Sequence, residues 1–202
     1  MRAQIAVSFV LVFLGGVAAT TGRAAAGSST PEFRGFAADV DAYHASSWTF
    51  TDPIDPYGDH HISMDVGLGL RLSYAVSPRF APYAAVHLVT SDFGEKTGTT
   101  SSIGMQLRIP WTRRFMPFAT AGIGHLSDPE FNVSYDLAEF GAGMQVFLSG
   151  RLALHPLLEF VTPLGDGERE IDGGKRDVEL DVHPIRGSFG LTWFLGARSG
   201  EG

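Results

Sequence analysis

A short segment in the second half of the chain carries the residue types of a serine hydrolase. It reads His125-Leu126-Ser127 and is followed by Asp128. Such an enzyme needs a general base within hydrogen-bond reach of its nucleophile, and a third group that orients the base. His125 and Ser127 are therefore candidate catalytic residues. The alternative is that they are simple polar residues at the end of a strand, because a motif is only a hypothesis until its structural context is known.

Asp59, His60 and His61 could together bind a transition metal, because imidazole and carboxylate groups suit zinc, nickel or copper. Their spacing matches no strong zinc signature. If the segment is a strand, His60 and His61 point to opposite faces. The chain has no cysteine, which excludes thiolate metal sites, disulfides and a cysteine nucleophile. We therefore expect no bound metal and no cofactor.

A third set of candidates consists of charged residues that are spread along the chain. They share the smaller and more polar face of the strands that are predicted below. In a narrow interior, charges are costly unless they are paired, so opposite charges should form a hydrogen-bonded network. The other interpretation is a path for protons or ions. The candidates are Asp39, Asp41, Asp65, Arg71, Arg108, Glu139, His155, Glu159 and Arg186.

The elements that must position these residues are strands. Between residues 61 and 74, every even position from Ile62 to Tyr74 is apolar or aromatic, and the odd positions are small or polar. A period of two is the pattern of a strand, and a helix of period 3.6 cannot produce it. Seven further segments follow the same rule, at about residues 36–43, 80–88, 103–111, 118–124, 138–148, 152–160 and 185–195.

The composition of the two faces indicates the solvent on each side. One face is almost purely aliphatic and aromatic, whereas the other holds small and polar residues that suit the interior of a narrow barrel. Lys96 and Lys175 are the only lysines, and both fall in predicted loops, as expected where a lipid-facing belt excludes charge. Tight turns alternate with longer polar loops at about residues 45–60, 90–101, 126–136 and 165–181. The sequence thus predicts an all-β fold, an eight-stranded antiparallel transmembrane β-barrel with short periplasmic turns and long extracellular loops.

Residues 1–26 have the features of a secretory signal peptide. Arg2 gives a positive start, residues 5–19 form an apolar stretch, and residues 24–26 offer a small-residue cleavage site. The apolar stretch is shorter than the roughly 20 residues of a spanning helix. We expect cleavage after Ala26, a barrel domain over residues 27–202, and a location in the bacterial outer membrane. The net charge of −7 and the pI near 5.4 argue against a nucleic-acid partner.

With this pattern, residues 33–196 resemble the small eight-stranded outer-membrane barrels, the class of OmpA-type domains and OmpX-like proteins. A partial likeness to the lipid A deacylase (PagL, acyloxyacyl hydrolase-like) family covers residues 117–165, through Pro117–Gly124 and Phe140–Met144. That family places a catalytic His-x-Ser-Asn motif on the strand after the Gly-rich one. Here the matching strand, residues 158–164, lacks the motif. The His-x-Ser of residues 125–127 lies on a different strand.

These observations favour a non-enzymatic integral barrel of the outer membrane, with a structural or surface-interaction role through its extracellular loops. Two alternatives remain open. One is a lipid A-modifying hydrolase related to the deacylases, and the other is a narrow channel. The expected partners are outer-membrane lipids and lipopolysaccharide, and we expect a monomer that binds no nucleic acid.

Overall fold

The computed structural model describes residues 32–45, 48–51, 59–62, 66–91, 96–128, 132–171, 174–180, 185–195 and 198–199. None of these residues belongs to a helix that is long and apolar enough to cross a membrane. Eight long strands dominate the structure, and neighbouring strands pair antiparallel. They are β2 (Gly35–Ala45), β5 (Val66–Ala75), β6 (Phe80–Ser91), β7 (Lys96–Arg108), β8 (Phe115–Asp128), β9 (Val133–Phe147), β10 (Leu152–Pro163) and β13 (Ile185–Phe194).

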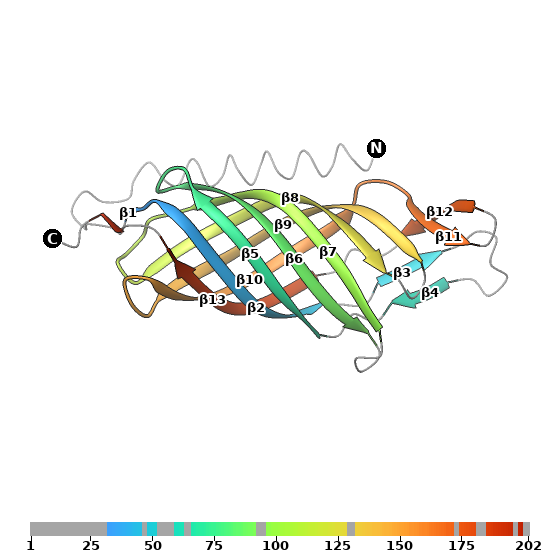
Figure 1. The fold of residues 1–202 in the computed structure, drawn as a ribbon, viewed down its shortest axis with the longest axis horizontal. Coiled ribbons are helices and arrows are strands. Elements are labelled where there is room, and N and C mark those ends of the chain that lie inside the picture. The colour runs from blue at the N-terminus through green and yellow to red at the C-terminus, as the bar shows by residue number, and fades with distance from the viewer. Residues whose placement is uncertain are drawn as a thin grey trace.

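The eight strands close into a barrel (Figure 1). Each strand pairs with the next one along the chain, from β2 through β5, β6, β7, β8, β9 and β10 to β13. The last strand, β13, returns to pair with β2 and completes the circle. The closed eight-stranded antiparallel barrel that the alternation predicts is therefore confirmed.

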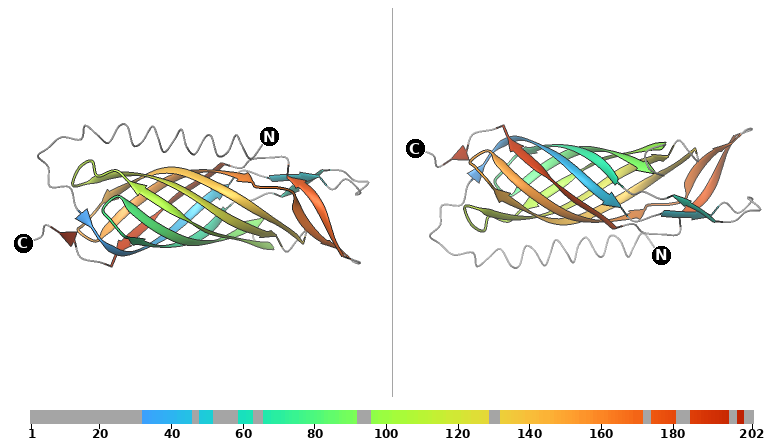
Figure 2. Two further views of the ribbon diagram at one scale, coloured as in Figure 1. Left: turned by 90° about the horizontal axis from the view of Figure 1, so that it is seen from above. Right: turned by 90° about the horizontal axis from the view of Figure 1, so that it is seen from below.

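The two ends of the barrel differ, as Figure 2 shows from two sides. At the turn side, consecutive strands are joined by residues 76–79, 109–114 and 148–151. At the loop side, β11 (Gly167–Ile171) and β12 (Gly174–Leu180) form a hairpin that pairs with the beginning of β9. β12 pairs in turn with β3 (Trp48–Thr51), and β3 pairs with β4 (Asp59–Ile62). These four short strands extend the sheet beyond the loop-side rim.

The loop-side sheet agrees with one prediction from the sequence and corrects another. The alternation over residues 61–74 predicts one strand, and β4 and β5 share one register, in which Trp48 pairs with Ile62 and Tyr43 pairs with Gly67. The predicted loops at 45–60 and 165–181 contain β3, the first half of β4, β11 and β12. These segments pair with neighbouring strands, although their sequences lack the apolar alternation of the barrel wall.

An apolar cluster closes the interior at the turn side. Phe194 is completely buried, and its ring centroid lies 4.3 Å from that of Phe33 and 5.3 Å from that of Phe147. Phe33 belongs to β1 (Glu32–Phe33), which pairs with β14 (Arg198–Ser199) at the same end of the barrel. The members of this turn-side cluster are Phe33, Ala37, Ala75, Ala81, Met116, Phe147, Ala153 and Phe194.

The outer wall of the barrel is apolar and exposed, the reverse of a protein that folds around an apolar core. Along β5, outward residues are exposed and inward residues are buried in strict alternation. Leu68 and Ile103 keep 63% and 62% of their surface exposed. Exposed apolar surface on this scale marks an interaction with another apolar phase. This apolar belt also includes Phe36, Val40, Leu70, Leu72, Val86, Leu88, Ile123, Leu158, Phe160, Phe189 and Leu191.

The seam between β9 and β10 is interrupted at one point. The paired residues run to Leu154 opposite Val146 and resume only at Leu157 opposite Gly143. Pro156 lies in the gap and has no backbone N–H to donate to β9. On the outer wall, Pro156 and Gly187 line a shallow groove of about 790 Å³ whose other lining residues are mostly apolar.

An alanine at Gly122 should destabilise the barrel. Its Cβ would lie 2.6 Å from the Tyr83 hydroxyl oxygen and 2.8 Å from the carbonyl oxygen of Ile103. Overpacking of this kind costs about 1–3 kcal/mol, which urea unfolding in detergent micelles can measure. The matched control is Gly187→Ala, because a Cβ there would meet nothing within 4 Å. Equal losses of unfolding free energy in both variants would contradict this prediction.

Candidate functional site

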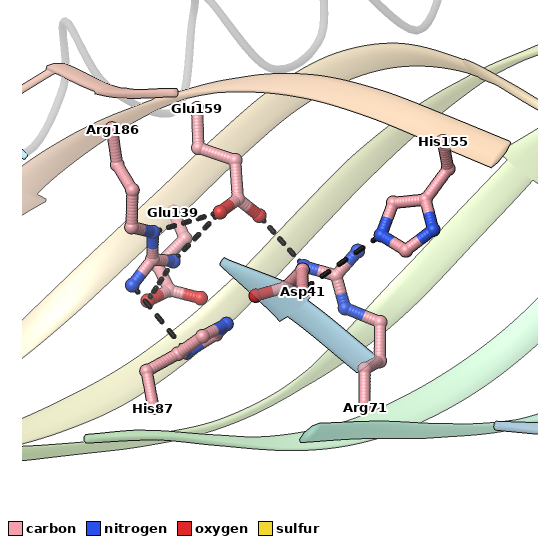
Figure 3. A network of polar contacts seen from close by, with 7 residues as sticks. All are labelled: Asp41, Arg71, His87, Glu139, His155, Glu159 and Arg186. Atoms are coloured by element: carbon pink, nitrogen blue, oxygen red, sulfur yellow. Dashed lines mark hydrogen bonds and ion pairs between the residues drawn. The ribbon is translucent and has the colours of Figure 1, made fainter. Parts of the chain in front are cut away.

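A layer of buried charged side chains lies inside the barrel, on the loop side of the turn-side cluster (Figure 3). Glu159 of β10 lies at its centre. Arg71 Nη2 donates to Glu159 Oε1 at 2.8 Å, and Arg186 Nε donates to Oε2 at 2.9 Å. We call this set the interior network. Its members are Asp41, Arg71, His87, Glu139, His155, Glu159 and Arg186.

The ion pair between Arg71 and Glu159 crosses the lumen. Arg71 lies on β5 and Glu159 on β10, and the strands β2 and β13 separate them around the wall. Both side chains are 1% exposed, so water does not screen their attraction. The Arg71 guanidinium also lies 4.6 Å from the centroid of the Tyr83 ring. This contact between cation and ring adds to the attraction at a dry site.

Arg186 connects Glu159 to side chains of two further strands. Its Nη2 lies 3.0 Å from Glu139 Oε1 on β9, and its Nη1 lies 3.5 Å from His87 Nδ1 on β6. One guanidinium therefore contacts two carboxylates from two strands. A buried ion pair offsets the cost of its desolvation only when further hydrogen bonds satisfy the charged groups, and Arg186 meets that condition.

A second branch of the interior network joins β10, β2 and β13. His155 Nε2 lies 3.7 Å from Asp41 Oδ2. On the other side of the ring, His155 Nδ1 lies 3.0 Å from the Thr192 hydroxyl oxygen, to which Gln145 Nε2 donates at 3.4 Å. A Cβ at Gly69 or Gly190 would collide with Asp41. The glycines of the neighbouring strands thus make room for this carboxylate.

Arg108 lies inside the barrel but between the interior network and the turn-side cluster. Its Nε donates to Gln106 Oε1 at 2.8 Å, and its Nη2 donates to Ser73 Oγ at 3.4 Å. Its guanidinium lies 5.7 Å from the centroid of the Phe194 ring. Asp39 is also buried, and it faces Arg71 in the register of β2 and β5.

Strand register explains why the charges meet. Glu159 and Arg186 are direct partners in the pairing of β10 with β13.

Some polar atoms of the same interior, including Tyr83 Oη and Thr120 Oγ1, make no hydrogen bond within the described part of the chain. Buried groups of this kind usually bind ordered water. Within the described ranges, no group of three or more histidine, aspartate or glutamate residues could hold a metal ion. The layer therefore has the chemistry of a polar packing that links opposite walls.

The structure places the predicted interior residues as follows. Asp39, Asp41, Arg71, Arg108, Glu139, His155, Glu159 and Arg186 are all buried inside the barrel. Asp65 lies outside the described residues. Asp59, His60 and His61 belong to β4 at the loop side, where their backbone pairs with β3. A metal site at these three residues stays a prediction.

The candidate pair His125 and Ser127 lies on the outside of the barrel, near the loop-side end of β8. His125 Nδ1 lies 2.9 Å from Asp136 Oδ1, and the two side chains are 52% and 76% exposed. The residues are direct partners in the pairing of β8 with β9. Ser127 follows His125 by two positions on the strand, so its side chain lies on the same outward face.

Sequence reasoning missed Asp136 and the uncharged partners of the interior network. Asp136 could have been found by pairing the strands before and after residues 129–132 as a hairpin and counting to the partner of His125. Ser73, Gln106, Gln145 and Thr192 lie on inward positions of predicted strands, but no charge distinguishes them. Tyr83 gave no signal, because an inward tyrosine is not unusual in a polar interior.

Replacing Glu159 with glutamine should strongly destabilise the barrel. The change removes the charge to which both Arg71 and Arg186 are bonded. Breaking one side of a buried pair costs about 3–5 kcal/mol, because the partner stays buried without a counter-charge. The measurement is the free energy of unfolding in urea, in detergent micelles.

The control for this prediction is Glu168→Gln. Glu168 accepts a hydrogen bond from Lys175 at 2.6 Å, but both side chains are more than half exposed. Water screens such a pair, so we expect no measurable loss of stability. A Glu159→Gln protein that is as stable as the control would show that the interior network does not hold the barrel.

Comparison with known proteins identifies the fold. No protein-family model and no curated protein matches the chain. Among solved structures, the chain is similar to the outer membrane protein OprG from Pseudomonas aeruginosa, with 13% identity and a TM-score of 0.57 over 85% of this chain and 100% of that one. It is also similar to the outer membrane protein AlkL, with 14% identity and a TM-score of 0.54 over 87% of this chain and 96% of that one.

A third similar structure is Neisserial surface protein A, with 12% identity and a TM-score of 0.52 over 79% of this chain and 97% of that one. At these identities the likeness concerns the fold alone. The finer resemblance to OmpA-type and OmpX-like proteins, and to the deacylases, stays a prediction. The chain thus has the fold of the small outer-membrane barrels with which it aligns.

Proposed function

We propose that the chain is an integral outer-membrane protein with a closed, non-conducting barrel and no enzymatic activity, which acts through the surface of its loop side. Residues 1–26 are its cleaved signal peptide and residues 27–202 the mature barrel protein. The observation that carries the proposal is the inversion of polarity between the two faces of one closed sheet. The apolar belt is exposed on the outside, and charged side chains, among them the ion pairs of Arg71 and Arg186, are buried on the inside.

The height of the apolar belt fits a bilayer. On β5, outward apolar residues run from Val66 to Tyr74. At about 3.4 Å per residue this is about 27 Å of strand, or about 21 Å along the barrel axis for a tilt of about 40°. Outer-membrane barrels have a band about 25 Å tall. A closed barrel is also one of only two structures that satisfy all backbone hydrogen bonds in lipid.

The filled interior supports a barrel that does not conduct. The interior network spans the lumen with the ion pair of Arg71 and Glu159, and Phe194 with its aromatic neighbours closes the turn side. An eight-stranded interior is only wide enough for its own side chains. The narrow channel that the sequence leaves open is therefore disfavoured.

The loop side supports a role in surface interaction. The hairpin of β11 and β12 stands beyond the rim and exposes the acidic residues Glu168, Glu170, Asp177 and Glu179. We propose outer-membrane lipids and lipopolysaccharide as its surroundings. We propose that the protein acts as a monomer.

A second candidate function, lipid A hydrolysis, is favoured by the bond between His125 and Asp136. An aspartate bonded to Nδ1 orients an imidazole so that Nε2 can take a proton from a serine, and Ser127 lies on the same face. The site also lies where the apolar belt ends. The row of paired residues on its turn side is apolar and consists of Ile103, Ile123 and Ala138. The next row towards the loop side is polar and consists of Ser101, His125 and Asp136. That boundary is the level of the lipid ester bonds.

Lipid A composition distinguishes the two functions. Cells that express the chain, the His125→Ala variant or the Ser127→Ala variant should yield lipid A with identical acyl chains by mass spectrometry. Loss of an ester-linked chain with the wild type alone would establish the hydrolase and refute the non-enzymatic proposal. Asp136→Asn then serves as the variant that removes only the orienting group.

Bilayer recordings test the closed interior. We expect no discrete conductance steps after insertion of the folded protein into planar bilayers, because the interior network and the turn-side cluster fill the lumen. A porin added to the same bilayer shows that the assay detects open pores. The heat-dependent gel mobility of the inserted sample shows that the barrel is folded. Regular steps from a folded sample would refute the closed interior.

A further inference from the structure

The three turns of the turn side share one design. Each has a hydroxyl residue, then one residue, then an arginine, and then the first residue of the next strand. The segments are Ser77–Phe80, Thr112–Phe115 and Ser149–Leu152. In each turn the backbone N–H of the arginine lies 3.3 Å from the hydroxyl oxygen two residues before it.

The arginine backbone is held on its other side as well. The carbonyl oxygen of each turn arginine accepts a hydrogen bond from the backbone N–H of the last residue of a strand that ends at the same rim. Arg108 N–H donates to Arg79 at 2.7 Å, Phe147 N–H donates to Arg114 at 2.8 Å, and Phe194 N–H donates to Arg151 at 2.8 Å. Three equivalent arginines are thus fixed at three equivalent positions around one rim.

The fourth strand that leaves this rim follows the same rule. β2 begins at Gly35, directly after Arg34, just as β6, β8 and β10 begin directly after Arg79, Arg114 and Arg151. All four arginine residues are exposed. None of the four is paired with a carboxylate in the described part of the chain. The turn segments 76–79, 109–114 and 148–151 contain no aspartate or glutamate.

Exposed aromatic side chains surround these arginines. The residues are Tyr74, Phe80, Trp111, Phe115 and Trp193, which lie at the turn-side ends of their strands or in a turn, with 38% to 61% of their surface exposed. Aromatic side chains gather where a bilayer meets water. The guanidinium groups next to them therefore stand at the depth of the lipid headgroups. Figure 1 shows the turns together at the end of the barrel that also holds β1 and β14.

We propose that Arg34, Arg79, Arg114 and Arg151 form a turn-side arginine ring that binds the phosphate groups of anionic phospholipids in the facing leaflet. The guanidinium group suits this partner, because its planar fork donates two parallel hydrogen bonds to a phosphate. A basic side chain near an anionic membrane surface also attracts it over a Debye length. This inference rests on the proposed membrane location and adds a lipid partner at the turn side.

The charge of the loop side differs from that of the turns. The described residues of the hairpin of β11 and β12 include four acidic and three basic residues, whereas the described turns carry only arginine as a charged residue. The two rims therefore favour different headgroup environments. The arginine ring attracts anionic phospholipid directly, and this attraction requires no metal ion.

Quenching of tryptophan fluorescence tests the ring. The mature chain with Trp48→Phe keeps Trp111 and Trp193, both at the turn side. It is reconstituted into phosphatidylcholine vesicles that contain either brominated phosphatidylglycerol or brominated phosphatidylcholine at equal mole fraction. We expect the anionic lipid to quench more strongly. In the Arg114→Gln/Arg151→Gln variant, the preference for the anionic lipid should fall by roughly fivefold per arginine.

The matched control removes two charges from the other rim, with Arg169→Gln/Arg176→Gln, and should keep the full preference. A ring variant that keeps the preference, or a control that loses as much, would overturn the arginine ring while the membrane proposal stands. Absence of quenching by both brominated lipids would refute the membrane proposal, and the ring with it. Heat-dependent gel mobility confirms that each variant is folded before it is compared.

Discussion

A cylinder of eight strands leaves an interior that its own side chains fill, so a charge placed inside must find its counter-charge inside. Glu159 shows how this chain meets that constraint. It is bonded to Arg71 from across the lumen and to Arg186 from the next strand, and Arg186 passes the contact on to Glu139. The outer wall is then free to carry the apolar belt. The closed interior and the exposed apolar belt are thus two results of one arrangement.

Which side chains point inward can be predicted from the sequence, because a strand alternates with a period of two. Parity alone assigns Arg71, Glu159 and Arg186 to the inner face. It cannot say which of them meet, because Arg71 and Glu159 are 88 positions apart on strands that are not neighbours. Their contact depends on the stagger of the closed sheet. Thr192, an uncharged partner, cannot be recognised at all without that stagger.

The loop side is less predictable for a physical reason. Apolar alternation marks strands that face lipid on one side, but β11 and β12 have polar residues on both faces and therefore resemble a loop in sequence. Their pairing with β9 and β3 emerges only in the structure. The bond between His125 and Asp136 is of the same kind. Each residue alone is an ordinary surface residue, and only the strand register places the two side chains within hydrogen-bond distance.

The gap at Pro156 has a mechanical consequence. The strands β9 and β10 form the seam next to β13, and the seam lacks two successive pairings where Pro156 lines the outer groove. Backbone amides of β9 near Met144 should therefore be less protected than those of unbroken ladders such as β6 with β7, and solvent deuterium should reach them first. Local opening of the cylinder should begin at this gap, so the wall is not uniform around its circumference.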